Sequence, residues 1–237
     1  MIEITGLTKR YGSKTAVDDV TFTAKPGRVT GFLGPNGAGK SSTLRILLGL
    51  DHATAGSARI NGKPYQRLAQ PLRTVGAMLD GAAPLPERRG VDHLRWIAQS
   101  NRISARRVGE VLEQVGLADA GKTRVRKYSL GMKQRLGLAA ALLGEPDILV
   151  LDEPVNGLDP AGIRTVRTFL RRYAQEGHTV LLSSHLMGET ADTVDDVVII
   201  NRGRIVTRGT LDEVTAGYPS LEEAFFGLTG SRPGESW

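Results

Sequence analysis

The chain has 237 residues, with 31 Lys+Arg against 25 Asp+Glu, a formal charge of +6, 29 glycines and no cysteine. The lack of cysteine excludes disulfides, thiolate nucleophiles and Cys-ligated metal sites, and the four histidines show no paired metal-ligand spacing. The longest nearly apolar run, residues 136–144, is about half as long as a spanning helix requires, and the N-terminus shows no basic and then apolar leader. We therefore expect an ordinary cytosolic protein that neither spans a membrane nor is exported.

The first third of the chain is predicted to form strands around a glycine-rich loop. Residues 1–7 alternate in polarity, as do residues 16–23, and a short apolar strand at 29–33 leads directly into the segment GPNGAGKSS. A helix follows, with Leu44, Leu47 and Leu48 on one face. Residues 56–61 and 74–79 are predicted to form further strands.

From residue 91 to residue 144 the pattern is helical. Ser104 is a predicted N-cap for a helix whose apolar residues follow an i, i+3, i+4, i+7 spacing, and Ser129 is a predicted cap for another that reaches Gly144. Strand and helix then alternate, with strands at 148–151, 179–183 and 197–200, a helix from Pro160 capped by Asp159, and a helix ending near 194.

This order of elements indicates an α/β fold in which helices cover a parallel sheet, with a helical lobe inserted at about 81–144. We expect one domain over residues 1–230, with a core at about 1–80 and 145–216, and a C-terminal tail at 231–237.

The positive charge is concentrated in the inserted lobe. Residues 81–135 contain 12 Lys+Arg and 5 Asp+Glu, a local excess of +7, whereas the rest of the chain has 19 basic and 20 acidic residues. Solvated helix faces and a surface that meets an anionic partner both explain this excess.

The segment from Gly34 to Ser41 fits the pattern G-x-x-x-x-G-K-S between a strand and a helix, which is the context of a phosphate-binding loop. Its glycines permit positive φ angles and let backbone N–H groups converge on phosphate oxygens. Lys40 is expected to reach the β- and γ-phosphates, and the Ser41 hydroxyl is expected to bind Mg²⁺.

The apolar strand at 148–151 ends in two carboxylates, Asp152 and Glu153. The carboxyl end of a buried parallel strand opens on the ligand crevice of such a sheet. Asp152 is therefore expected to bind Mg²⁺, and Glu153 to act as the general base that polarises the attacking water.

Over residues 2–216 the sequence resembles the ATP-binding cassette (ABC) ATPases. The loop and the acidic strand end match the Walker A and Walker B segments, and YSLGMKQR at 128–135 is similar to the family signature. NGLD at 156–159 is similar to the D-loop and SSHL at 183–186 to the switch-histidine loop. The versions of YSLGMKQR and NGLD found here resemble those of bacterial drug, antibiotic and polysaccharide exporters.

The resemblance implies a P-loop NTPase-type core with an N-terminal antiparallel β subdomain and an inserted helical signature subdomain. It also implies a head-to-tail dimer, in which Ser129 and Gly131 of one subunit close on the γ-phosphate held by the other. His185 would contact the γ-phosphate, Asp159 would communicate across the dimer and Tyr11 would stack on adenine. The implied nucleotide contacts are Tyr11, Gly34, Pro35, Asn36, Gly37, Ala38, Gly39, Lys40, Ser41, Ser42, Ser129, Gly131 and Asp159.

Three positions depart from the family pattern. Leu130 and Met132 stand where the usual signature has a glycine and a glutamine, and Asp80 stands where the family has the Q-loop glutamine. An aspartate can still hold a Mg²⁺-bound water, although it cannot donate an amide hydrogen bond. Asp80 therefore joins Ser41 and Asp152 as a candidate for the metal site.

The implied function is that of an ATP-binding and ATP-hydrolysing transporter subunit that powers a separate permease and lies on the inner face of the cell membrane. ATP and Mg²⁺ are the expected cofactors, a drug, antibiotic or other small amphiphile is the expected cargo, and nucleic acid is not an expected partner. The alternatives are a soluble ABC-type ATPase that acts on nucleic acid or ribosomes, and a non-catalytic nucleotide-gated adaptor.

Overall fold

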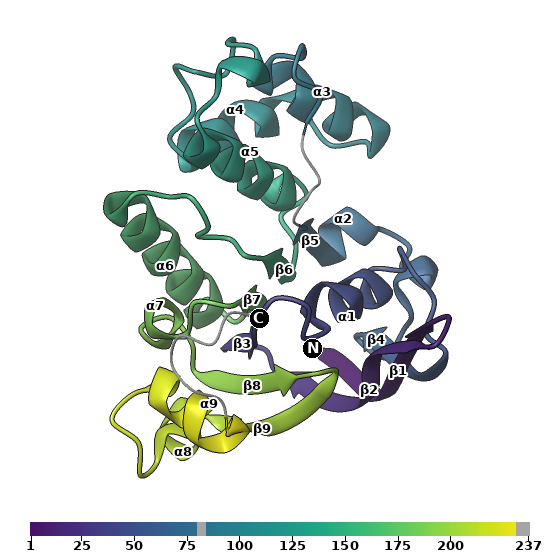
Figure 1. The fold of residues 1–237 in the computed structure, drawn as a ribbon. Coiled ribbons are helices and arrows are strands. Elements are labelled where there is room, and N and C mark those ends of the chain that lie inside the picture. Colours follow the sequence, from purple (N-terminus) through teal and green to yellow (C-terminus); the bar gives the residue numbers. More distant parts are fainter. Residues whose placement is uncertain (80–83, 231–237) are drawn as a thin grey trace. The chain divides into compact units, whose positions relative to one another are not determined.

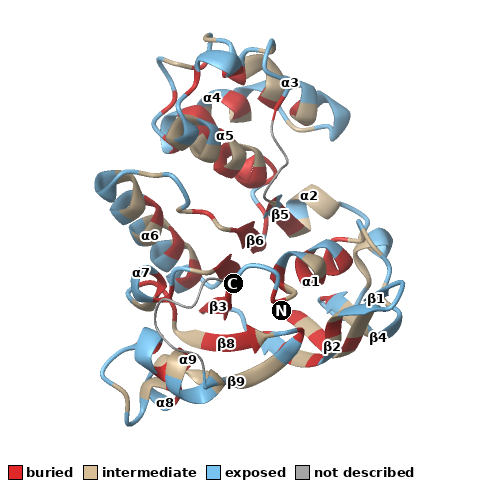
Figure 2. Ribbon diagram, in the orientation of Figure 1, coloured by how far each residue is buried: buried red, intermediate tan, exposed pale blue. Residues whose placement is uncertain are grey.

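The computed structural model describes residues 1–79 and 84–230. Contacts between residues divide the chain into two compact units. One unit consists of Met1–Leu68 and Arg167–Trp237, and the other consists of Ala69–Val166 (Figure 1). Each unit has its own buried core (Figure 2). The domain limits predicted from the sequence remain a prediction.

The first unit contains an antiparallel sheet and a set of mostly parallel strands. The antiparallel sheet has the strand order β2-β1-β4, and the other strands follow the order β7-β3-β8-β9. Strand β3 is parallel to both β7 and β8, and all of its residues are buried, as expected for its short apolar run. The strands are β1 (Ile2–Tyr11), β2 (Lys14–Ala24), β3 (Val29–Leu33), β4 (Ala55–Ile60), β7 (Thr179–Ser184), β8 (Asp196–Asn201) and β9 (Arg204–Thr210).

Strand β9 is an addition to the predicted sheet, and it is antiparallel to β8. The two strands are joined at Arg202 and Gly203, whose φ angles are 48° and 82°. Two positive φ angles in a two-residue loop are the geometry of a tight hairpin, so this short connection reverses the chain.

The helices of the first unit include one that continues directly from the phosphate loop. Helix α1 (Lys40–Leu47) buries Leu44 and Leu47, and Leu48 directly after it is also buried, which confirms the predicted apolar face. The other helices are the 3-10 helix η1 (Tyr65–Arg67), α7 (Met187–Ala191), α8 (Leu211–Thr215) and α9 (Leu221–Thr229).

The second unit combines two parallel strands with a group of helices. Strand β5 (Val75–Met78) pairs with β6 (Ile148–Asp152), and α5 packs against β5 at Gly76, where a Cβ atom would lie 2.0 Å from the carbonyl oxygen of Ala141. Only glycine allows this close approach. The helices are α2 (Pro71–Thr74), α3 (Gly90–Ser100), α4 (Ala105–Gln114), the 3-10 helix η2 (Val125–Lys127) and α5 (Leu130–Leu142), and α6 (Pro160–Gln175) begins in this unit.

The predicted helix caps are present. The backbone N–H of Arg106 donates to the Ser104 hydroxyl at the start of α4, and that of Met132 donates to the Ser129 hydroxyl at the start of α5, over 3.3 and 3.2 Å. Asp159 accepts from the backbone N–H of Gly162 over 2.7 Å at the start of α6. These side chains satisfy N–H groups that have no partner within the helix.

Across residues 1–79 and 84–230, no helix combines the length and the apolar character that crossing a membrane requires.

Candidate functional site

The glycine-rich loop of the first unit runs from the end of β3 to the start of α1. Gly37 and Gly39 have φ angles of 78° and 109°, in the left-handed region that favours glycine. At Gly34, a Cβ atom would lie 2.2 Å from the carbonyl oxygen of Ile200 in β8, so the loop leaves the sheet through a space that admits no side chain. The loop therefore has the backbone freedom and the close strand contact of a phosphate-binding loop.

The Lys40 side chain is held within this loop. It is 5% exposed, and its ammonium donates to the carbonyl oxygens of Gly34 at 2.6 Å and Pro35 at 3.2 Å. A buried ammonium requires such oxygen partners. The loop thus combines a concentrated positive charge with the N-terminus of α1, whose dipole also favours an anion.

Tyr11 lies at the end of β1 and is 47% exposed. Its hydroxyl donates to Asp51 over 2.5 Å, and the Lys9 ammonium lies 4.7 Å from the centre of its ring. Lys9 also donates to Asp51 over 2.6 Å. These bonds lower the pKa of Asp51, with Lys9 as the largest cause, and the bond to Asp51 raises the pKa of Tyr11. Tyr11 is therefore a tethered ring on the surface.

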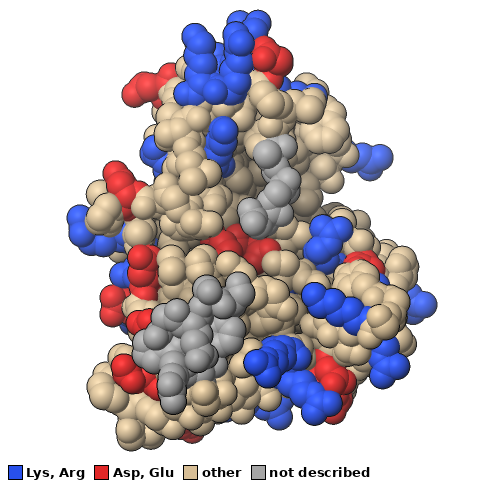
Figure 3. Space-filling view, viewed as in Figure 1, with Lys and Arg blue, Asp and Glu red and all other residues tan. Residues whose placement is uncertain are grey.

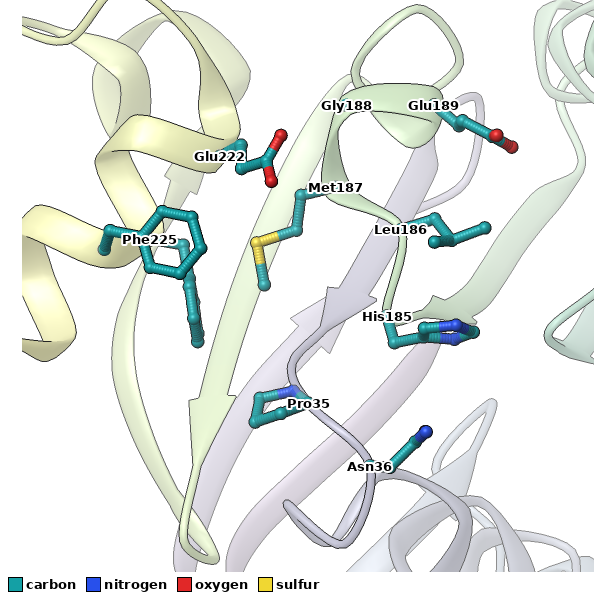
Figure 4. Close-up of a pocket in the computed structure, with 10 residues that line it drawn as sticks. Pro35, Asn36, His185, Leu186, Met187, Gly188, Glu189, Glu222 and Phe225 are labelled. Carbon is teal, nitrogen blue, oxygen red and sulfur yellow. The ribbon is translucent and has the colours of Figure 1, made fainter. Parts of the chain in front are cut away.

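His185 follows the last residue of β7 and faces the same cavity as the glycine-rich loop. The cavity has a volume of about 510 Å³, and its lining includes Pro35, Asn36 and His185. Figure 4 shows the side chains of Leu186 and Asn36 on either side of the His185 imidazole, with Met187 turned toward Phe225. Glu222 and Phe225 of α9 form another part of the wall. The loop and the switch-histidine segment thus share one pocket.

In the second unit, the buried strand β6 ends at Asp152, which is 3% exposed. Glu153 follows with a φ angle of 52°, which is uncommon for a residue with a side chain. The side-chain amide of Gln134 on α5 donates to the carbonyl oxygens of Glu153 over 3.4 Å and Asn156 over 3.2 Å. The two carboxylates therefore lie at a sharp turn that α5 supports.

The signature segment and the D-loop contact each other within this unit. A Cβ atom on Gly157 would lie 2.1 Å from the Leu130 side chain, and one on Gly131 would lie 3.3 Å from Leu158. Leu130, which departs from the usual signature, is 58% exposed and covers Gly157. Glycine at 157 leaves the room that this larger side chain needs.

The predicted site residues are distributed over both units. Tyr11, the loop residues 34–42 and His185 belong to the first unit, and Ser129, Gly131, Asp152, Glu153 and Asp159 to the second. Asp80 lies outside the described residues. Sequence reasoning missed Lys9, Asp51 and Gln134; their contacts join segments 19 to 42 residues apart, which no local pattern reveals.

The candidate metal ligands fit Mg²⁺ in their chemistry. The Ser41 hydroxyl and the Asp152 carboxylate are hard oxygen donors, which Mg²⁺ prefers. Within the described ranges no group of three or more His, Cys, Asp or Glu side chains forms a metal site.

The family model described as ABC transporter matches residues 17–156, from β2 to the D-loop segment. The chain belongs to this family. It is therefore an ABC-type ATPase with the nucleotide-binding fold that its sequence predicts.

Two curated relatives match nearly the whole chain. The bacitracin transport ATP-binding protein BcrA of Bacillus licheniformis is 41% identical over 217 residues, which cover 90% of this chain and 71% of BcrA. The lantibiotic transport ATP-binding protein SrtF of Streptococcus pyogenes is 36% identical over 225 residues, 95% of this chain and 96% of SrtF.

A solved structure of the ATP-binding subunit of an ABC transporter is similar in fold, with a TM-score of 0.86 and 29% identity over 97% of this chain and 99% of that one. The fold prediction is thereby confirmed.

Proposed function

We propose that this ABC ATPase binds and hydrolyses Mg²⁺-ATP to drive a separate permease that exports a drug, an antibiotic or another small amphiphile. The observation that carries the proposal is the buried Lys40 ammonium, held inside a glycine loop at the N-terminus of α1. The relatives BcrA and SrtF, whose names refer to bacitracin and lantibiotic transport, support this class of cargo.

We propose the following binding and catalytic roles for the individual residues. The backbone of residues 34–42 and the Lys40 ammonium bind the phosphates, while Tyr11 stacks on the base. Bound Mg²⁺, held by Ser41 and Asp152 with Asp80 as a further candidate, would neutralise phosphate charge. Glu153 polarises the attacking water, and His185 contacts the γ-phosphate.

A second subunit is proposed to complete each site. Ser129 begins α5 and Gly131 lies in its first turn, and a helix N-terminus attracts anions. We propose that this end of one copy closes on the γ-phosphate held by the other copy, with Asp159 at the contact between them. The permease would keep the pair at the inner face of the cell membrane.

The test of the enzymatic assignment is Glu153→Gln. This change keeps the size of the side chain but removes its basicity, so we expect Mg²⁺-ATP turnover to fall by at least about 100-fold while ATP affinity is retained. Turnover is measured by phosphate release, and affinity by equilibrium titration with a fluorescent ATP analogue.

Glu113→Gln, which makes the same chemical change on the exposed side of α4, is the matched control and should leave turnover unchanged. If the Glu153→Gln protein hydrolysed ATP at the wild-type rate, Glu153 would not be the base.

A further inference from the structure

The segment that leads from β6 to α6 begins with a tight turn at the proposed base. The backbone N–H of Asn156 donates to the carbonyl oxygen of Glu153 over 3.2 Å, and Pro154 occupies the second position of this turn, which proline favours. Glu153 itself has a φ angle of 52°, in the left-handed region that a residue with a side chain rarely adopts. Such a conformation persists only where the surrounding structure holds it in place.

Gln134, in the second turn of α5, supplies this support. Its side-chain amide donates to two carbonyl oxygens, those of Glu153 over 3.4 Å and Asn156 over 3.2 Å. One amide group therefore binds both the first and the last residue of the turn. Because the carbonyl group and the side chain of Glu153 are bonded to the same Cα atom, holding the carbonyl also fixes the direction in which the carboxylate leaves the backbone.

Leu130 contacts the next turn of the segment from the same face of α5. Leu130 and Gln134 are four residues apart, so their side chains lie on one side of the helix. A Cβ atom on Gly157 would lie 2.1 Å from the Leu130 side chain, and Figure 1 shows α5 beside the segment that leads from β6 to α6. One face of the helix thus covers both turns.

The base and its support differ in what they can reach. Glu153 is half-buried, and Figure 3 shows acidic side chains at the surface over the end of β6. Gln134 is also half-buried and carries no charge, and its amide donates to backbone oxygens of the turn. Its contacts are therefore those of a group that holds the base in place, and not of a group that contacts the reacting atoms.

We propose that Gln134 is a positioning residue for ATP hydrolysis, whose amide holds the Glu153 backbone so that the carboxylate faces the attacking water. This inference rests on the proposed function, in which Glu153 is the base. Ser129 begins the same helix and is proposed to meet the nucleotide held by the other copy. Helix α5 therefore joins the signature of one site to the base of the other site within a single chain.

The test is Gln134→Met, which keeps the length of the side chain but removes its N–H donors. We expect kcat for Mg²⁺-ATP to fall by at least about tenfold, since a displacement of about 1 Å can cost about 100-fold, while KM changes by less than about twofold. Phosphate release over a range of ATP concentrations measures both constants.

Gln114→Met, the same change at the exposed end of α4, is the matched control and should leave both constants unchanged. An unchanged kcat in Gln134→Met, or an equal loss of kcat in the control, would overturn the proposal.

A second variant separates positioning from folding. Gln134→Glu keeps the shape of the side chain but places an acceptor against two carbonyl oxygens, so kcat should fall at least as far as in Gln134→Met. Urea denaturation shows whether each variant is fully folded under the assay conditions, and Gln134→Glu alone decides the test if Gln134→Met is not. A fully folded Gln134→Glu protein with the wild-type kcat would overturn the proposal.

The Glu153→Gln background assigns the effect to the base. Adding Gln134→Met there should lower the remaining turnover by less than about twofold, because the group that Gln134 positions is already lost. Single-turnover phosphate release with protein in excess over ATP measures this low rate. A further loss as large as that in the wild-type background would show that Gln134 acts by another route, and would overturn the proposal.

Glu153→Gln by itself tests the proposed function separately. Wild-type turnover in that variant would remove Glu153 as the base. A loss of turnover in Glu153→Gln without a loss in Gln134→Met would leave the base in place and overturn only the positioning role.

Discussion

The orientation of the Tyr11 ring depends on Asp51, a residue 40 positions away in the chain. The hydroxyl is bound to the Asp51 carboxylate, while the Lys9 ammonium, bound to the same carboxylate, lies 4.7 Å from the ring centre. One face of the ring is thus turned toward a cation. We expect a base to stack on the opposite face, and the tether to reduce the rotamer freedom lost on binding.

Asp51→Ala should therefore weaken ATP binding by about 3- to 10-fold, a range set by the loss of one charged hydrogen bond and the freed ring. Binding of inorganic triphosphate, which has no base, should not change. Equilibrium titrations of both ligands provide the measurement. In a Tyr11→Ala background the same substitution should have no further effect on ATP, and an undiminished effect there would show that Asp51 acts by another route.

His93 provides a second expectation at the scale of one residue, because its imidazole is partly buried in α3. Its Nδ1 atom is buried and, among the described residues, has no hydrogen-bond partner. Burial lowers the pKa of His93, and the neighbouring Arg88 lowers it further. In the folded protein the His93 imidazole therefore stays neutral at pH values low enough for the same imidazole to bind a proton in the unfolded chain.

Since the pKa is lower in the folded state, the stabilisation is complete above the ordinary histidine pKa of about 6.5 and is lost as the pH falls toward the folded-state value. The urea midpoint, followed by Trp96 emission in a Trp237→Phe background, should drop between pH 7.5 and pH 5.5. His93→Leu should reduce this drop, whereas His52→Ala at an exposed position should retain it. An equal drop in all three proteins would assign the pH dependence to other groups.

At the scale of elements, two helices of the second unit begin with the same kind of cap. Ser104 and Ser129 each accept a backbone N–H at the start of their helix. Only Ser129 belongs to the segment proposed to meet nucleotide. Comparing Ser104 with Ser129 therefore distinguishes the effect of losing a helix cap from the effect of losing a nucleotide contact.

Ser104→Ala and Ser129→Ala should each lower the free energy of unfolding by about 1 kcal/mol. Only Ser129→Ala should also lower Mg²⁺-ATP turnover, because it alone removes a hydroxyl from the shared site. Urea denaturation and phosphate release measure the two quantities. Equal losses of turnover in both variants would mean that stability, and not nucleotide contact, governs the effect.

The elements that sequence patterns predicted are those whose signals are local. The strand at 29–33, the glycine loop and α1 form one continuous segment, and Ser104, Ser129 and Asp159 cap the helices that directly follow them. The site residues of these segments could therefore be predicted from residue type and spacing. Their arrangement across the two units remains a prediction.

The elements that were missed include β9 and α9 near the C-terminus, as well as the short helices η1 and α2. Strand β9 is mostly half-buried, so its residues show no clear alternation, and its position depends on pairing with β8. Helix α9 had a usable signal, since Ser220 accepts the backbone N–H of Glu223 three residues later. Asp51 and Gln134 could not be found in this way, because tertiary contacts alone bring them to Tyr11 and Glu153.

At the scale of the whole molecule, we expect the proposed dimer to form only when ATP is bound and to persist only when ATP is hydrolysed slowly. The Glu153→Gln protein should form a dimer with Mg²⁺-ATP and remain a monomer with ADP, because the γ-phosphate is the group that both subunits would contact. Light scattering after gel filtration measures the mass. Adding Lys40→Ala should abolish the dimer, and a dimer that persisted without nucleotide would contradict ATP-dependent assembly.

The hairpin between β8 and β9 also bears on how the protein is made. The backbone N–H of Gly203 donates to the carbonyl oxygen of Ala38 in the phosphate loop over 2.9 Å, and its carbonyl oxygen accepts from Asp18 in β2 over 2.8 Å. The loop is therefore hydrogen-bonded to a residue that the ribosome adds 165 positions later. A nascent chain released before that point lacks the hydrogen bond from Gly203 to the phosphate loop. We therefore expect incomplete products to bind ATP only weakly.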